Sequence, residues 1–157
     1  MNNHETLNDL AEKLIELQNS TTVFLESFGK TNLKAQINAQ SEENSIIRRN
    51  TLLFFDSPES PILYCISYLK RDRLSEMEYE LLMKTNIPIG KIFIDQNKDK
   101  KIAKKNITIA STFNVAAARL LNVRSSFLYE KKYDFYIEQR NIGRIMEFFN
   151  EESLTRR

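Results

Sequence analysis

Charged side chains interrupt two otherwise apolar stretches of this 157-residue sequence, and they are the first candidates for chemistry. Arg48 and Arg49 are adjacent within IIRRNTLL (46–53), and Glu147 lies within RIMEFF (144–149). Neighbouring residues of a strand point to opposite faces, so one arginine is solvated and the other can enter the interior. Alternation puts Glu147 on the apolar face of its strand, where a lone carboxylate is costly unless it is paired. Two simpler structures also fit the pattern: an edge strand with a solvated glutamate, or a structural Arg–Glu pair.

The remaining inventory of reactive residues excludes several classes of site. His4 is the only histidine and Cys65 the only cysteine, so histidine triads and zinc–cysteine clusters are excluded. Gly29, Gly90 and Gly143 lie too far apart for a P-loop or a dinucleotide-binding fingerprint. Catalysis would then rest on carboxylates, arginines, hydroxyls and backbone amides. This inventory suits chemistry on an anionic small molecule and predicts neither a metal nor a cofactor.

Charge and hydropathy favour a globular protein that binds no nucleic acid. The 23 basic residues face 21 acidic ones, which describes a mixed, solvated surface. The densest basic run, 98–105 (KDKKIAKK), predicts a solvated loop and strand entry, with a phosphate-binding patch as the alternative. No apolar stretch approaches the ~20 residues of a membrane span, and the N-terminal segment lacks the pattern of a secretory signal. The expected location is the cytoplasm, or the plastid stroma for an organelle-encoded chain.

Periodicity and turn residues predict an α+β fold. Helices are expected over 5–18, 21–28, 75–84, 87–93 and 114–121. Strands are expected over 34–39, 46–56, 62–69, 102–111, 127–138 and 144–149. Turn chemistry at 56–61 and at 139–143 makes hairpins of the strand pairs that flank these segments. Helices first, followed by strands with helices inserted between them, indicate an antiparallel sheet in a single domain spanning 1–157.

Four motifs in order make the sequence resemble the chorismate lyase family, including its bacterial, archaeal and plastid-encoded branches, over residues 14–149. The first is the NSTT turn with the short helix and Gly-Lys-Thr that follow it (19–31), and the second is the arginine-bearing strand 48–53. The third is the Pro-Ile-Gly turn (88–90), and the last is the terminal IGRIMEFF (142–149). The chain departs from the family at 108–111, where it reads TIAS in place of Glu-Ile-Gly-Arg.

The resemblance assigns roles to four residues. The substrate-binding arginine of the family maps to Arg49, and its catalytic glutamate maps to Glu147. Two backbone amides that contact the ligand map to Thr21 and Ile89.

The resemblance also implies a fold and an activity. The implied fold is a curved antiparallel sheet with helices closing a buried ligand pocket. The implied reaction removes pyruvate from chorismate to give 4-hydroxybenzoate, without a cofactor, in quinone biosynthesis. The expected partner is therefore a small aromatic acid, and the expected assembly is a monomer or a small homo-oligomer. Two alternatives remain: a sensor-like module that binds an aromatic acid without turnover, and a structural protein whose Arg and Glu only pair.

Overall fold

Six antiparallel strands and four α-helices make up the part of the chain that the computed structural model describes, Lys13 and residues 20–150. The strands are β1 (Lys34–Glu43), β2 (Ile46–Phe54), β3 (Leu63–Lys70), β4 (Ile102–Phe113), β5 (Phe127–Ile137) and β6 (Arg140–Phe149). The helices are α2 (Thr21–Gly29), α3 (Glu76–Lys84), α4 (Ile89–Gln96) and α5 (Val115–Leu121), with a 3-10 turn over Arg71–Arg73. The predicted α+β class is confirmed. The helix predicted over 5–18 lies outside the described residues except for Lys13.

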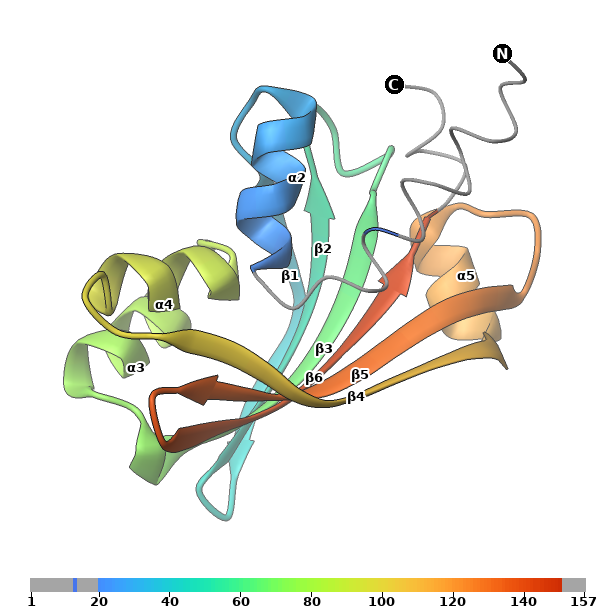
Figure 1. Ribbon diagram of the computed structural model, residues 1–157. Coiled ribbons are helices and arrows are strands. Elements are labelled where there is room, and N and C mark those ends of the chain that lie inside the picture. The colour runs from blue at the N-terminus through green and yellow to red at the C-terminus, as the bar shows by residue number, and fades with distance from the viewer. Residues whose placement is uncertain (1–12, 14–19, 151–157) are drawn as a thin grey trace.

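The strands form one curved sheet in the order β1-β2-β3-β6-β5-β4 (Figure 1). Strands β3 and β6 come from distant parts of the sequence, and their pairing joins the N-terminal half of the sheet to the C-terminal half. Strands β1 and β4 are the edges. The two charged stretches noted in the sequence therefore lie near the middle of the sheet, on β2 and β6.

Polar caps start the helices where the sequence predicts them. Ser75 accepts a hydrogen bond from the amide of Glu78, and the Glu78 carboxylate accepts one from the amide of Ser75, which completes a capping box. Ser20 and Asn114 cap α2 and α5 with their side-chain oxygens. None of the described helices has the length and apolar character needed to cross a membrane.

The hairpin of β2 and β3 is confirmed, but the turn of the last hairpin lies earlier than predicted. A turn was expected over 139–143, whereas β6 already begins at Arg140 and the chain reverses at Glu138 and Gln139. Glu138 adopts the left-handed conformation, with φ of 53°, which closes the tighter turn. Gly143 consequently lies inside a strand.

The sheet buries both of its faces. On one face Leu52, Tyr64 and Phe148 pack against α5. On the other face Leu53, Leu63 and Phe149 pack with Leu25 of α2, and the side chains from α3 and α4 join a second apolar cluster. This second side, covered by α2, α3 and α4, is called the pocket face below (Figure 1). Odd-numbered residues of β2, β3 and β6 point to it, and these include both Arg49 and Glu147.

A β-bulge divides the edge strand β4. The register of β4 with β5 shifts between Lys105 and Thr108, and Asn106 takes a left-handed conformation with φ of 55°. One extra residue in β4 therefore separates its two halves. The first half lies beside the pocket face, and residues 108–111 of the second half are exposed.

We predict that Gly143→Ala is strongly destabilising. A Cβ at this position would clash with the backbone oxygen of Tyr68, and φ is +151°. Because neither the paired strand nor the backbone angle can adjust cheaply, the free energy of unfolding should fall by about 3 kcal/mol or more in urea denaturation. Arg144→Ala is the control: its side chain is largely exposed, so a loss below about 1 kcal/mol is expected. Equal losses in the two variants would contradict the steric argument.

Candidate functional site

Two adjacent rows of side chains cross the centre of the pocket face. The first row, here called the Glu147 row, is defined by the partners that lie opposite one another on β2, β3, β6 and β5: Thr51, Cys65, Glu147 and Lys131. The second, the Arg49 row, contains Arg49, Ser67, Ile145 and Tyr133 on the same strands. Strand spacing and rise place the Cα atoms of Arg49 and Glu147 roughly 12 Å apart on a flat sheet. Two long side chains at this separation can reach the same small ring.

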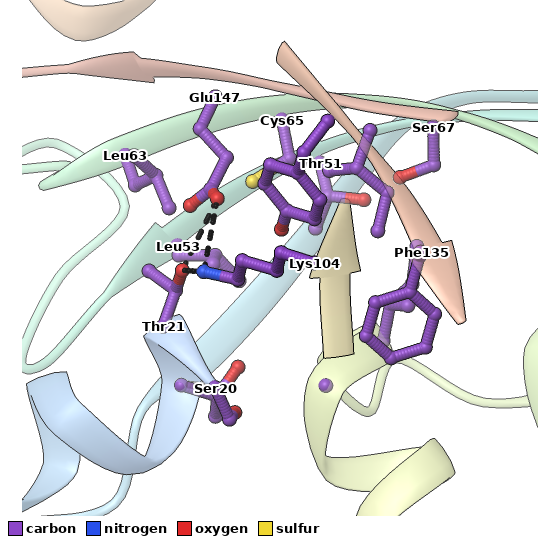
Figure 2. A pocket seen from close by; sticks show the side chains of 15 residues that line it. Ser20, Thr21, Thr51, Leu53, Leu63, Cys65, Ser67, Lys104, Phe135 and Glu147 are labelled. Atoms are coloured by element: carbon purple, nitrogen blue, oxygen red, sulfur yellow. Dashed lines mark hydrogen bonds and ion pairs between the residues drawn. The ribbon is translucent and has the colours of Figure 1, made fainter. Parts of the chain in front are cut away.

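A cavity of about 50 Å³ lies between these rows and the starts of α2 and α4 (Figure 2). Its lining includes apolar groups such as Leu53, Leu63 and Phe135, together with the polar side chains of Thr51 and Ser67. A cavity that holds a benzene ring measures roughly 150 Å³. An aromatic acid therefore requires lining groups to move outward when it binds.

Glu147 is fully buried and is held by two neighbours (Figure 2). Its Oε1 accepts a hydrogen bond from the hydroxyl of Thr21 at 3.1 Å and lies 3.7 Å from Nζ of Lys104. The Lys104 ammonium donates to the same Thr21 hydroxyl at 2.7 Å. The exposed fractions of the Lys104 and Glu147 side chains are only 2% and 1%. The Glu147 carboxylate, which would be costly to bury alone, is thus paired. Its partner is a lysine and not an arginine.

Arg49 is a buried cation beside the cavity wall. Its Nη2 donates to the carbonyl oxygens of Thr85 and Ile87, at 3.2 and 3.0 Å, while its Nε and Nη1 have no hydrogen-bond partner. Among the described residues, no carboxylate forms an ion pair with it. Burial lowers the pKa of Arg49 to about 10, so its guanidinium remains charged at neutral pH. Buried, charged N–H groups without acceptors are rare, and they favour an anion.

The N-termini of two helices meet at the mouth of the cavity. Thr21 and Thr22 of α2, and Ile89 and Gly90 of α4, contribute to its lining. The first amides of a helix have no acceptor within that helix, and its N-terminal end carries partial positive charge. A Cβ on Gly90 would lie 2.7 Å from Oγ1 of Thr22, so the lack of a side chain at Gly90 lets the helices approach this closely. The predicted positions Thr21 and Ile89 are therefore brought together.

Tyr133 and Cys65 are neutral groups in this charged surrounding. Burial, reinforced by the charge of Glu147, raises the pKa of the Tyr133 phenol well above its usual value. Burial and Glu147 likewise raise the pKa of the Cys65 thiol, which Lys104 and Arg49 only partly offset. A buried thiol with a raised pKa is a poor nucleophile.

Lys131 places a second lysine next to Glu147, on β5, and its side chain is fully buried. Burial first, and then repulsion from Lys104, lower the pKa of Lys131 from 10.5 to about 8, against an opposing effect of Glu147. Lys131 does not line the cavity. It therefore contributes positive potential near the Glu147 carboxylate from outside the cavity lining.

The structure thus brings together most of the site that the sequence predicts. Glu147, Thr21 and Ile89 line one cavity, whereas Arg49 lies one row away, beside the lining residues Thr51 and Ser67. Sequence reasoning missed Lys104, because the run 98–105 was interpreted as solvated apart from a phosphate-binding alternative. Lys98, Lys100 and Lys101 are exposed as expected, but Lys104 is buried. Its position two residues after Ile102, on the same face of a strand, was the available signal.

The fold is similar to that of several solved structures, which include an effector domain and a ligand-binding domain. The effector domain of PhnF from Mycobacterium smegmatis superposes with a TM-score of 0.61 at 13% identity, covering 85% of this chain and 90% of that one. The ligand-binding domain of a protein described as a GntR-family transcriptional regulator from Bordetella bronchiseptica gives 0.55 at 12% identity, covering 75% and 85%. A GntR-family regulator from Enterococcus faecalis gives 0.54 at 12% identity, covering 73% and 91%. At these identities the likeness establishes the fold alone.

The sequence itself identifies the family. A family model described as "Chorismate pyruvate-lyase Rv2949c-like" matches residues 10–156, nearly the whole chain. The protein therefore belongs to the Rv2949c-like chorismate pyruvate-lyase family. No curated protein matches the sequence.

The lowered pKa of Lys131 gives a prediction about stability and pH. Between pH 8 and pH 10.5 the native protein has lost a proton that the unfolded chain still binds, so the free energy of unfolding rises with pH. Lys131→Met removes this dependence. We expect the stability of the wild type relative to this variant to rise by about 1 kcal/mol between pH 7 and pH 9.5 in urea denaturation. The exposed neighbour Lys132, changed to Met, should show no such trend, and a pH-independent difference for Lys131→Met would contradict the assignment.

Proposed function

We propose that this protein removes pyruvate from chorismate to give 4-hydroxybenzoate, in the cavity between α2, α4 and the sheet. Arg49 and Glu147 are the catalytic pair, and the amides of Thr21 and Ile89 bind the substrate. The membership of the family supports the reaction class. Arg49 and Glu147 lie on one face of one sheet, which supports their common role.

One observation carries the proposal: the pocket face holds buried charged groups whose hydrogen bonding is incomplete. Nε and Nη1 of Arg49 have no acceptor, and Oε2 of Glu147 has no donor. Leaving such groups unsatisfied costs about 1–3 kcal/mol each, and more when they are charged. A ligand with an anionic group for Arg49 and a hydroxyl for Glu147 satisfies both. Chorismate, a dianion with a ring hydroxyl, has this combination.

The reaction requires little covalent chemistry from the protein. The ether bond between the ring and the enolpyruvyl oxygen breaks, a proton leaves the ring carbon that bears the hydroxyl, and the ring becomes aromatic. The released enolpyruvate takes up a proton and becomes pyruvate. Aromatisation drives the reaction, so the protein mainly has to hold the dianion and stabilise the charge that develops on the leaving oxygen.

Each proposed residue has a defined part in this reaction. Arg49, with two free N–H directions, stabilises the developing charge on the leaving oxygen. Oε2 of Glu147 accepts the hydrogen bond of the ring hydroxyl and orients the carbon that loses its proton. The helix amides at Thr21 and Ile89 hold a carboxylate, since helix N-termini favour anions.

A second candidate function is binding without turnover. It is favoured by the known structures with this fold, one of which is an effector domain and another a ligand-binding domain. The two candidates separate in one experiment, in which purified protein is mixed with chorismate and 4-hydroxybenzoate is followed by absorbance. Thermal stabilisation by chorismate or 4-hydroxybenzoate without product formation would favour the binding module.

Glu147→Gln tests the catalytic assignment. The amide keeps the size of the side chain but removes its charge, so the rate of 4-hydroxybenzoate formation should fall on the order of 100-fold with KM nearly unchanged. Glu130→Gln is the matched control, because Glu130 lies on β5 opposite Phe148 and points to the other face. Unchanged turnover in Glu147→Gln would make Glu147 a structural residue.

Arg49→Met should strongly weaken the binding of 4-hydroxybenzoate, whereas Arg48→Met should have a mild effect. Arg48 is exposed and lies over the ring of Tyr68, on the opposite face. Loss of the charged contact of Arg49 should weaken binding by about 3 kcal/mol, roughly 100-fold, in calorimetric titration. Arg49→Lys, which keeps the charge, serves to separate this loss from any loss of folding. Equal affinities of the Arg48 and Arg49 variants would show that the face assignment is wrong.

A further inference from the structure

Lys104 is the one cavity-lining residue that comes from β4, and it is not among the residues assigned so far. Its ammonium contacts three groups of the site. It donates to the Thr21 hydroxyl at 2.7 Å, lies 3.7 Å from Oε1 of Glu147, and lies 4.6 Å from the centre of the Tyr133 ring. A lysine as buried as this one is rare unless it is paired, so its partner defines its role.

The contacts of Lys104 distinguish the two oxygens of Glu147. Oε1 receives the Thr21 hydroxyl and the nearby ammonium, whereas Oε2 is buried and has no partner. Thr21 has a single hydroxyl proton, and it donates that proton to Glu147 because it accepts from Lys104. The hydrogen-bond chain therefore runs in one direction, from Lys104 through Thr21 to Oε1. It fixes the rotation of the carboxylate of this cavity-lining residue and leaves the second oxygen, Oε2, without a partner (Figure 2).

The other ionisable groups around Glu147 cannot replace Lys104 in this role. Lys131, on the neighbouring strand β5, does not line the cavity. Cys65 and Tyr133, which face Glu147 from β3 and β5, stay neutral because burial raises their pKa values, so neither supplies a positive charge. The Tyr133 phenol also interacts with Glu147 and Thr21 through its hydroxyl, but as an uncharged group. Arg49 lies in the next row and points its Nη2 at the segment before α4.

We infer that Lys104 is a positioning residue, which acts through Thr21 to hold the Glu147 carboxylate in place with Oε2 presented to the substrate. The inference rests on the proposed function, since it names how the catalytic carboxylate of that function is prepared. Lys104 itself makes no contact with the substrate in this arrangement. Its contribution to turnover must then depend on a carboxylate at position 147.

A four-protein comparison tests this dependence: wild type, Lys104→Met, Glu147→Gln and the double variant. Chorismate turnover is measured for each, with melting temperature as a check on folding. With Glu147 present, Lys104→Met should lower kcat at least tenfold and leave KM within about twofold. In the Glu147→Gln background the same change should alter kcat less than twofold, because the group on which Lys104 acts has been removed. Lys104→Arg should recover part of the loss.

Lys105→Met is the matched control, since it removes the same charge one residue away. Lys105 is exposed and its ammonium lies over the Tyr136 ring, so turnover should remain at the wild-type level. An equal loss from Lys104→Met in both backgrounds, or a raised KM, would overturn the inference and make Lys104 a structural or substrate-binding residue.

If the wild-type protein shows no turnover of chorismate, the proposed function is contradicted. The role of Lys104 can still be tested with the same proteins. The same four proteins are then compared by their melting temperatures without ligand. Lys104→Met should lower the melting temperature by several degrees when Glu147 is present, because it leaves a buried charge uncompensated, and by much less beside Gln. Equal shifts in the two backgrounds would show that Lys104 does not hold Glu147.

Discussion

The burial of one carboxylate determines how the centre of this protein is arranged. Glu147 lies in the middle of an apolar sheet face, and a carboxylate there must have compensating partners or lose its charge. Its partners come from two other elements: Thr21 from the first turn of α2 and Lys104 from the edge strand β4. One interaction thus ties a helix, an edge strand and a central strand together. Together with the apolar packing of Leu25, it holds α2 over the sheet at the cavity.

Strand register determines which other side chains lie beside Glu147. Pairing of β2, β3 and β6 sets Thr51, Cys65 and Glu147 side by side and puts Arg49 in the adjacent row. A shift of one residue in any of these pairings would turn the charged side chain to the face covered by α5. Gly143 protects the register of β3 with β6, since only a residue without a side chain allows the strands to approach so closely there.

Local patterns were sufficient to predict most of the elements and the apolar setting of Glu147, whereas the choice of Arg49 over Arg48 came from the resemblance to the chorismate lyase family. Alternation of polar and apolar residues placed Arg49 and Glu147 on strands, and the polar residues Ser75 and Asn114 marked the starts of helices. The pairing of β3 with β6 and the burial of Lys104 depend on contacts between distant segments, which no local pattern contains. Lys104 illustrates this limit of local patterns, because it belongs to a basic run whose composition is that of a solvated loop. Only the charge of Glu147, 43 residues further on, accounts for its burial.

The bulge in β4 bears on how freely this protein can change over evolutionary time. It separates the half of the strand that carries Lys104 from the exposed half at 108–111, and no lining residue of the cavity comes from the exposed half. Because the extra residue at the bulge already uncouples the two registers, insertions or substitutions beyond it can accumulate without moving the lysine. The TIAS sequence by which this chain differs from its family lies in that tolerant half. Mutational drift there leaves the wall of the cavity intact.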